Sequence, residues 1–183
     1  MSRSDDIAKR AIADCLAKAS QHPDDPQAQI ELFGALRAFN RNEEAKKLAA
    51  ILEQKFPQNA DVQIQLGAYY LENDRPAEAD AKFQLALDLA PDKPRIRNAV
   101  ARGYLAKGDL AKAGKVVASM PMPPSGEDGR VVRGLADAYQ DRGQHKEALG
   151  LSRMALAGAA VLGLDKEFRR RVKGTNPVTL SNC

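Results

Sequence analysis

Along most of the chain, apolar residues recur every three or four positions, which is the spacing of one face of an α-helix. Short clusters rich in Asn, Asp, Gly and Pro interrupt this spacing and predict turns. The clearest pair of apolar stripes predicts one helix over residues 60–72 and a second over residues 76–89. The first stripe comprises Leu66, Gly67 and Tyr70, and the second comprises Ala79, Phe83 and Ala86. Because small residues stand in both stripes, we expect the two helix axes to approach closely.

This helix–turn–helix pattern returns at a period of 34 residues, with one extra residue before the last copy. The residues at the equivalent six positions are Leu32, Phe33, Leu36, Ala45, Ala49 and Leu52 in the first copy, Val100, Ala101, Tyr104, Ala113, Val117 and Met120 in the third, and Leu135, Ala136, Tyr139, Ala148, Ser152 and Ala155 in the fourth. The first copy places Phe33 where a small residue is expected, so we expect its two helices to lie further apart. Residues 120–129, which contain several prolines, predict a long and sparsely packed connection before the fourth copy. Two interpretations of it stay open, a hinge and an insertion without consequence.

The residue types at these offsets resemble the tetratricopeptide repeat (TPR) family, whose unit is a helix–turn–helix of this length. The four copies span about three quarters of the chain, at residues 26–59, 60–93, 94–128 and 129–162. The second copy departs from the family pattern at Gln63, where an aromatic residue is usual. The resemblance implies an all-α fold, a right-handed α-solenoid of stacked helical hairpins, and a non-catalytic scaffold or adaptor that binds other proteins.

The two ends of the chain are predicted to cap this solenoid. An apolar stripe over residues 4–20 predicts an amphipathic helix within the N-terminal segment 1–25, with Cys15 packed in the core. Residues 163–173 predict a C-terminal capping helix with arginines on its outer side, because the last apolar face of a solenoid needs a polar cover. Residues 174–183 are predicted to be an exposed tail.

The concave groove of such a solenoid is expected to carry the binding site. If Leu66 packs against the partner helix, the opposite stripe of each first helix faces the groove. The second copy then offers an apolar floor, and the third and fourth copies offer polar anchors. The predicted floor residues are Ile64, Ala68 and Leu71, and the predicted anchors are Arg95, Asn98, Arg102, Arg130 and Arg133.

These residue types predict a partner of a particular chemistry. The planar fork of arginine suits carboxylates, and an asparagine can hold a peptide amide. We therefore predict a peptide-binding groove for a protein or peptide with acidic and apolar character. The alternative for the arginines is a solvated charged face without a ligand. TPR proteins that bind Hsp70 and Hsp90 use a clamp of Lys, Asn and Arg, and this clamp is absent because Ile30, Gly34, Ile64 and Ala68 stand at the positions concerned.

Charge is distributed unevenly over the 183 residues, with Lys+Arg 28 against Asp+Glu 24. Residues 1–93 hold 12 basic and 16 acidic side chains, whereas residues 94–183 hold 16 basic and 8 acidic. Opposite-signed halves can orient a partner, and they leave head-to-tail self-association open. The modest net charge of +4 and the few aromatics in the basic half argue against nucleic acid as the ligand.

The sequence shows no constellation for catalysis. His22 and His145 have no implied Cys, Ser or carboxylate partner, and Cys15 and Cys183 form no metal-ligand spacing. We therefore expect no enzyme activity, no metal and no cofactor. No apolar run is long enough for a membrane span or a signal peptide, so a cytoplasmic location is expected. One further alternative is an N-terminal recruiting or regulatory module of a larger enzyme.

Overall fold

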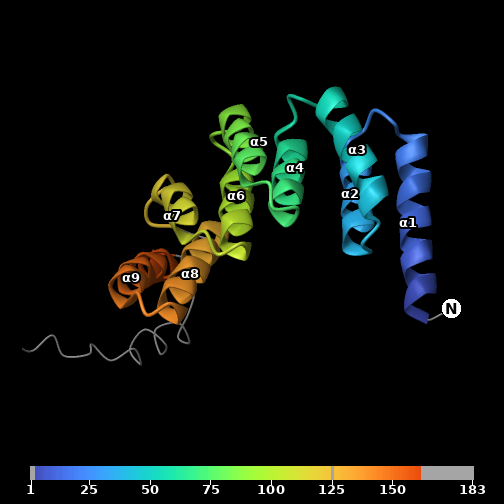
Figure 1. The fold of residues 1–183 in the computed structure, drawn as a ribbon. Helices are drawn as coiled ribbons and strands as arrows, with labels where there is room; N and C mark the ends of the chain where they lie inside the picture. Colours follow the sequence, from blue (N-terminus) through green and yellow to red (C-terminus); the bar gives the residue numbers. More distant parts are fainter. Residues whose placement is uncertain (1–2, 125, 162–183) are drawn as a thin grey trace, which may run out of the picture. The chain divides into compact units, whose positions relative to one another are not determined.

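The computed structural model describes residues 3–124 and 126–161, and these ranges contain nine helices and no strand. Figure 1 traces them in chain order: α1 (Arg3–Gln21), α2 (Pro26–Ala38), α3 (Asn42–Lys55), α4 (Ala60–Glu72), α5 (Pro76–Leu89), α6 (Pro94–Ala106), α7 (Leu110–Ala118), α8 (Gly126–Asp141) and α9 (His145–Val161). The predicted all-α repeat fold is confirmed. None of these helices is long and apolar enough to cross a membrane.

The 34-residue period appears in the backbone at the turn within each hairpin. Four residues at intervals of 34, 34 and 35 positions adopt a left-handed conformation, namely Asn40 (φ 57), Asp74 (φ 55), Gly108 (φ 73) and Gly143 (φ 73). In every case the N–H of the next residue donates to a carbonyl five residues earlier, at 2.8 or 2.9 Å. This bond closes the C-terminus of the first helix, and Gly, Asn and Asp are the residues that reach this conformation most easily.

Helix starts follow the same period in the first two repeats. Asp25 accepts from the backbone N–H groups of Gln27 and Ala28, and Asn59, 34 positions later, accepts from those of Asp61 and Val62. Such caps satisfy donors that have no partner within the helix. The next position in the series, Lys93, cannot accept a hydrogen bond and makes no cap.

Two buried glutamines donate hydrogen bonds to carbonyls at the end of the preceding helix. They stand at a position where the TPR pattern has an aromatic residue. The Nε2 of Gln63 donates to the carbonyls of Phe56 and Pro57, after the end of α3, at 3.4 and 3.1 Å. In the first repeat, Gln29 donates likewise to Ala19 at the end of α1, at 2.9 Å. An amide can therefore replace aromatic packing here because it satisfies carbonyls that the preceding helix leaves open.

Helices α4 and α5 approach each other closely at Gly67. A Cβ on Gly67 would lie 2.6 Å from two ring carbons of Phe83, so only glycine fits this contact. Phe83 itself is 1% exposed. In the first repeat the large residue is Phe33 on the first helix, and Ala49 takes the position of Phe83. There α2 and α3 approach each other less closely than α4 and α5 do, as the sequence predicted.

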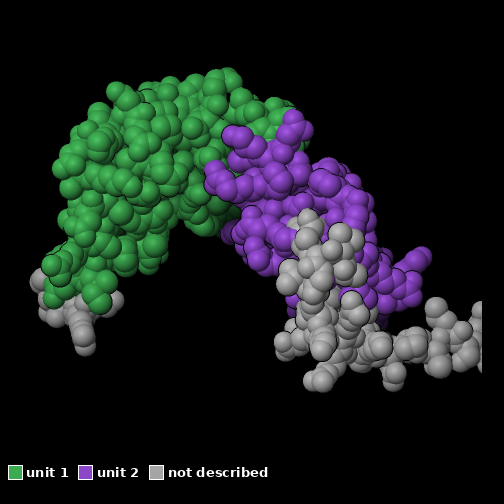
Figure 2. Space-filling view, turned by 180° about the vertical axis from the view of Figure 1, so that it is seen from behind, with its two compact units in different colours: residues 1–91 green, residues 92–183 purple. Residues whose placement is uncertain are grey.

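The chain divides into two compact units, residues 1–91 and residues 92–183, coloured separately in Figure 2. Each unit has its own apolar core. The largest fully buried apolar residues are Phe33, Leu52, Leu66 and Phe83 in the first unit, and Ile96, Val100, Val132 and Leu135 in the second. Each core is built from helices of consecutive repeats, as expected for a stack of hairpins that cannot bury their apolar faces alone.

The terminal predictions have mixed outcomes. Ile12 and Ala19 of α1 are buried, but Cys15 is only half-buried, at the margin of the packed face rather than inside the core as predicted. The predicted capping helix at 163–173 and the tail at 174–183 lie outside the described residues.

The proline-rich connection is packed at Met120 and Pro124 and exposed at residues 121–123 between them. Met120 and Pro124 are both buried, and a Cβ on Gly158 of α9 would lie 1.5 Å from the carbonyl oxygen of Pro124. The same oxygen would lie 3.3 Å from a Cβ on Gly129 of α8. Two glycines therefore allow the backbone at Pro124 to pack directly on α8 and α9. The expectation of sparse packing is wrong at Pro124 but agrees with the exposure of residues 121–123, and the choice between a hinge and an insertion stays a prediction.

Candidate peptide-binding site

Two of the predicted arginine anchors converge on one carboxylate in the second unit. Arg102 extends from α6, and its Nη2 lies 3.0 Å from Oε1 of Glu127 in the first turn of α8. The Nη2 of Arg130, one turn further along α8, lies 3.7 Å from the same oxygen. Both arginine side chains are exposed and Glu127 is half-buried, so this group is accessible from solvent. We refer to Arg102, Glu127 and Arg130 as the arginine–glutamate cluster.

A buried polar contact sets the position of this cluster. Asn98 lies one turn before Arg102 on α6, and its Nδ2 donates to Oδ1 of Asp128 at 2.9 Å. Asn98 and Asp128 are 1% and 7% exposed. Hydrogen bonds to charged groups in such surroundings are among the stronger ones in proteins. The contact therefore fixes the first turn of α8 against α6 and places Glu127 beside Arg102.

Asn98 differs from the sequence-based expectation of an amide on the groove surface. The structure buries it because α8 packs across this face of α6. Its Nδ2 is engaged by Asp128, and its Oδ1 has no hydrogen-bond partner among the described residues. Asn98 and Arg102 lie one turn apart on α6, and the packing of α8 decides which of them reaches solvent.

The remaining predicted site residues are distributed over both units. Arg95 is exposed in the first turn of α6, and Arg133 is half-buried on α8. In the first unit, Ala68 and Leu71 of α4 are half-buried. Ile64 of α4 is 7% exposed and belongs to the core rather than to an open floor. The residues brought together are thus the members of the arginine–glutamate cluster.

Sequence reasoning missed the acidic residues Glu127 and Asp128, which it assigned to the connection between repeats. The repeat register carried a signal for one of them. Asp128 stands at the position that continues the series Asp25, Asn59 and Lys93, where the first two members cap a helix. In the fourth repeat α8 starts three residues earlier than this register predicts, so this aspartate lies inside the helix and bonds to Asn98 instead.

The cluster joins two guanidinium groups to one carboxylate oxygen within the chain. Two guanidinium groups on adjacent helices can hold the oxygens of an acidic side chain, and Glu127 occupies this place in the structure. Within residues 3–124 and 126–161, no group of three or more His, Cys, Asp or Glu side chains could hold a metal ion.

No protein-family model and no curated protein matches the chain. Solved structures do match. MamA protein covers 98% of this chain and 92% of its own, with a TM-score of 0.56 at 15% sequence identity. A putative kinesin light chain from Podosopora anserina with nearly identical TPR-like repeats covers 86% of both chains, with a TM-score of 0.56 at 22% identity. These likenesses, together with the 34-residue period of the helical hairpins and their turns, show that the chain has the fold of a tetratricopeptide repeat array.

Proposed function

We propose that this chain is a non-catalytic protein-interaction scaffold that binds a peptide segment of a partner protein through acidic side chains. The observation that supports this function is the convergence of Arg102 and Arg130 on the carboxylate of Glu127, at 3.0 and 3.7 Å. The side chains of both arginines are more than half exposed, at 53% and 64%. A partner carboxylate can therefore approach both guanidinium groups without rearrangement of the helices.

The geometry also favours a specific site over a diffuse basic surface. Arg102 and Arg130 come from different helices whose relation is fixed by the buried contact between Asn98 and Asp128. Preorganised arginines lose less conformational freedom on binding, and residues of this kind often dominate the affinity of an interface. Ala68 and Leu71, which the sequence pattern predicts as an apolar floor, are half-buried in the first unit and would make any apolar contacts separately from the cluster.

The test uses a labelled peptide with three leucines followed by three glutamates, measured by fluorescence anisotropy. We expect the native chain to bind this peptide, and the double variant Arg102→Gln/Arg130→Gln to bind it about tenfold more weakly, because two exposed ion pairs are lost and each contributes less than about 1 kcal/mol. Neutral glutamine avoids the repulsion that a new acid beside Glu127 would cause.

The matched control is Lys146→Gln/Arg153→Gln, which removes the same charge from exposed positions on α9. If both double variants weaken binding equally, the attraction comes from net charge and the proposed site is wrong. A peptide with glutamines in place of the glutamates measures the acidic preference directly. A captured lysate protein that is lost only with the Arg102/Arg130 variant would then identify the natural partner.

A further inference from the structure

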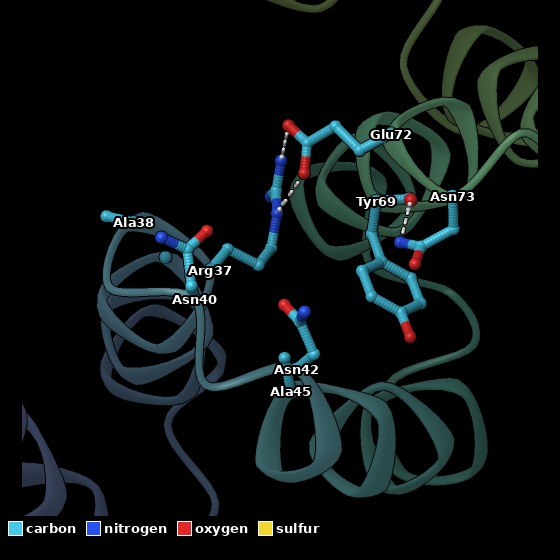
Figure 3. Close-up of a pocket in the computed structure, with 9 residues that line it drawn as sticks. Arg37, Ala38, Asn40, Asn42, Ala45, Tyr69, Glu72 and Asn73 are labelled. Carbon is cyan, nitrogen blue, oxygen red and sulfur yellow. Dashed lines mark hydrogen bonds and ion pairs between the residues drawn. The ribbon is translucent and has the colours of Figure 1, made fainter.

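A polar pocket of about 670 Å³ lies in the first unit among α2, α3 and α4. This volume is within the range of pockets that hold small ligands or side chains. The residues that line it are Gly34, Arg37, Ala38, Asn40, Asn42, Ala45, Tyr69, Glu72 and Asn73, most of them labelled in Figure 3. The space exists because small residues line it, and a Cβ on Gly34 would meet nothing within 4 Å.

The lining residues carry no net charge. Arg37 donates from Nε and Nη2 to the two carboxylate oxygens of Glu72 at 3.0 and 2.6 Å, as Figure 3 shows, and from Nη1 to Gln65 at 3.1 Å. This side chain is only 16% exposed, and its guanidinium lies 5.4 Å from the centre of the Phe33 ring. The one cation among the lining residues is therefore already matched, so the pocket does not favour an anionic ligand.

Two consecutive tyrosines of α4 differ in the partners of their hydroxyl groups. Tyr69 and Tyr70 are 8% and 7% exposed. The hydroxyl of Tyr70 donates to Oε1 of Glu53 at 2.7 Å. The hydroxyl of Tyr69 makes no hydrogen bond to any described residue, although its ring packs 5.4 Å from that of Phe33 and lines the pocket. Solvent reaches this hydroxyl from the pocket, so a ligand that enters can replace water as its hydrogen-bond partner.

Three asparagines supply further donors and acceptors around the same space. Asn73 donates from Nδ2 to the backbone carbonyl of Tyr69 at 2.8 Å, which orients its amide beside the pocket. Asn42, in the first turn of α3, also lines the pocket, and its side chain is labelled in Figure 3. Carboxamides offer both a donor and an acceptor, as a tyrosine hydroxyl also does. The pocket is thus complementary to an uncharged group that has donors and an acceptor in one plane.

We propose that this pocket binds a primary carboxamide, the side chain of an Asn or Gln in a partner peptide. The carboxamide lies beside the Tyr69 ring, exchanges hydrogen bonds with its hydroxyl, and pairs with the amides of Asn42 and Asn73. The pocket is a second docking site, in the first unit, and it does not depend on the arginine–glutamate cluster of the second unit. Its failure and the failure of the proposed function are therefore separate outcomes.

The test is an NMR titration of the full isotope-labelled chain with two capped tripeptides, acetyl-Ala-Gln-Ala-N-methylamide and its Glu counterpart. The methylamide cap ensures that the Gln side chain is the only primary carboxamide. We expect saturable shifts of the backbone signals of Gly34 and Asn42 with the Gln peptide and much smaller ones with the Glu peptide. Tyr69→Phe should weaken binding of the Gln peptide about fivefold, the effect of one neutral hydrogen bond.

Two further variants separate a binding role from a structural one. Gly34→Met places a side chain into the pocket and should abolish the response, whereas Gly150→Met on α9, where a Cβ also meets nothing within 4 Å, should leave it unchanged. Tyr69→Phe should keep the urea midpoint of the native chain, because its hydroxyl has no protein partner to lose. The proposal is overturned by equal responses to both peptides, by no saturable response to the Gln peptide, by a response that survives in Gly34→Met, or by a lowered urea midpoint in Tyr69→Phe.

Discussion

The contact between Gly67 and Phe83 predicts that adding one methyl group destabilises the first unit. A Cβ at residue 67 would lie 2.6 Å from Cδ1 and Cε1 of Phe83, whereas nonbonded carbon atoms prefer about 3.5–4.0 Å. The ring must therefore move by about 1 Å, and it is almost completely enclosed. Overpacking of this kind costs about 1–3 kcal/mol.

A matched variant separates this steric cost from the effect of alanine on the helix. Replacing glycine by alanine inside a helix gains about 0.8–1 kcal/mol. Gly34 also lies inside a helix, α2 of the same unit, but a Cβ there would meet nothing within 4 Å. Gly34→Ala should therefore be more stable than the native chain by about 1 kcal/mol. Gly67→Ala should be less stable than Gly34→Ala by about 1–3 kcal/mol, the steric cost alone.

Urea unfolding followed by far-ultraviolet circular dichroism measures both variants, with the denaturant slope compared to show that the exposed surface is unchanged. The double variant Gly67→Ala/Phe83→Leu should recover part of the loss, because leucine leaves room for the new methyl group. Equal stability of Gly67→Ala and Gly34→Ala would refute the close approach of α4 and α5. A larger loss in the double variant than in Gly67→Ala would show that the lost ring packing outweighs the relief of overlap.

Three further outcomes are expected. Glu127→Gln should bind the leucine–glutamate peptide about two- to fivefold more tightly, because the native carboxylate competes with the peptide for both arginines. The gain is small because an exposed ion pair contributes less than about 1 kcal/mol. Weaker binding would instead show that Glu127 is needed to position the two arginines. Burial, and to a smaller extent the hydrogen bond to Glu53, raises the pKa of the Tyr70 hydroxyl from 10.0 to about 12. The folded chain therefore holds this proton more tightly than the unfolded chain, and the free energy of unfolding should fall as the pH rises from 10.0 towards 12. Tyr70→Phe should lack that decline in urea titrations, and an unchanged pH profile would contradict the assignment. Gly158→Ala should lower the melting temperature more than any other single variant named here, since its Cβ would lie 1.5 Å from the carbonyl oxygen of Pro124; a native-like melting curve would show that the proline-rich segment is free to move.

The local sequence pattern alone was sufficient to predict the repeats, because each hairpin is formed by contacts within about 34 residues. Apolar spacing predicts the helices, and a few residue types mark their ends. The turns at Asn40, Asp74, Gly108 and Gly143 could be located from sequence, since Gly, Asn and Asp are the residues that enter the left-handed conformation most readily. The close pairing of Gly67 with Phe83 was also predictable, because one large and one small residue stand in facing stripes.

The candidate sites depend on contacts that sequence spacing does not determine. The helix stripe correctly grouped Asn98 and Arg102, but burial of the asparagine and pairing of the arginine required α8 to pack against α6, with partners 30 and 25 residues away. Tyr69 and Tyr70 are the same residue type at neighbouring positions, and only the helices around them give one hydroxyl a carboxylate and the other a pocket. Periodicity determines which face of a helix is apolar, whereas the exposure and partner of a polar side chain depend on which neighbouring helix reaches it, a property of tertiary packing.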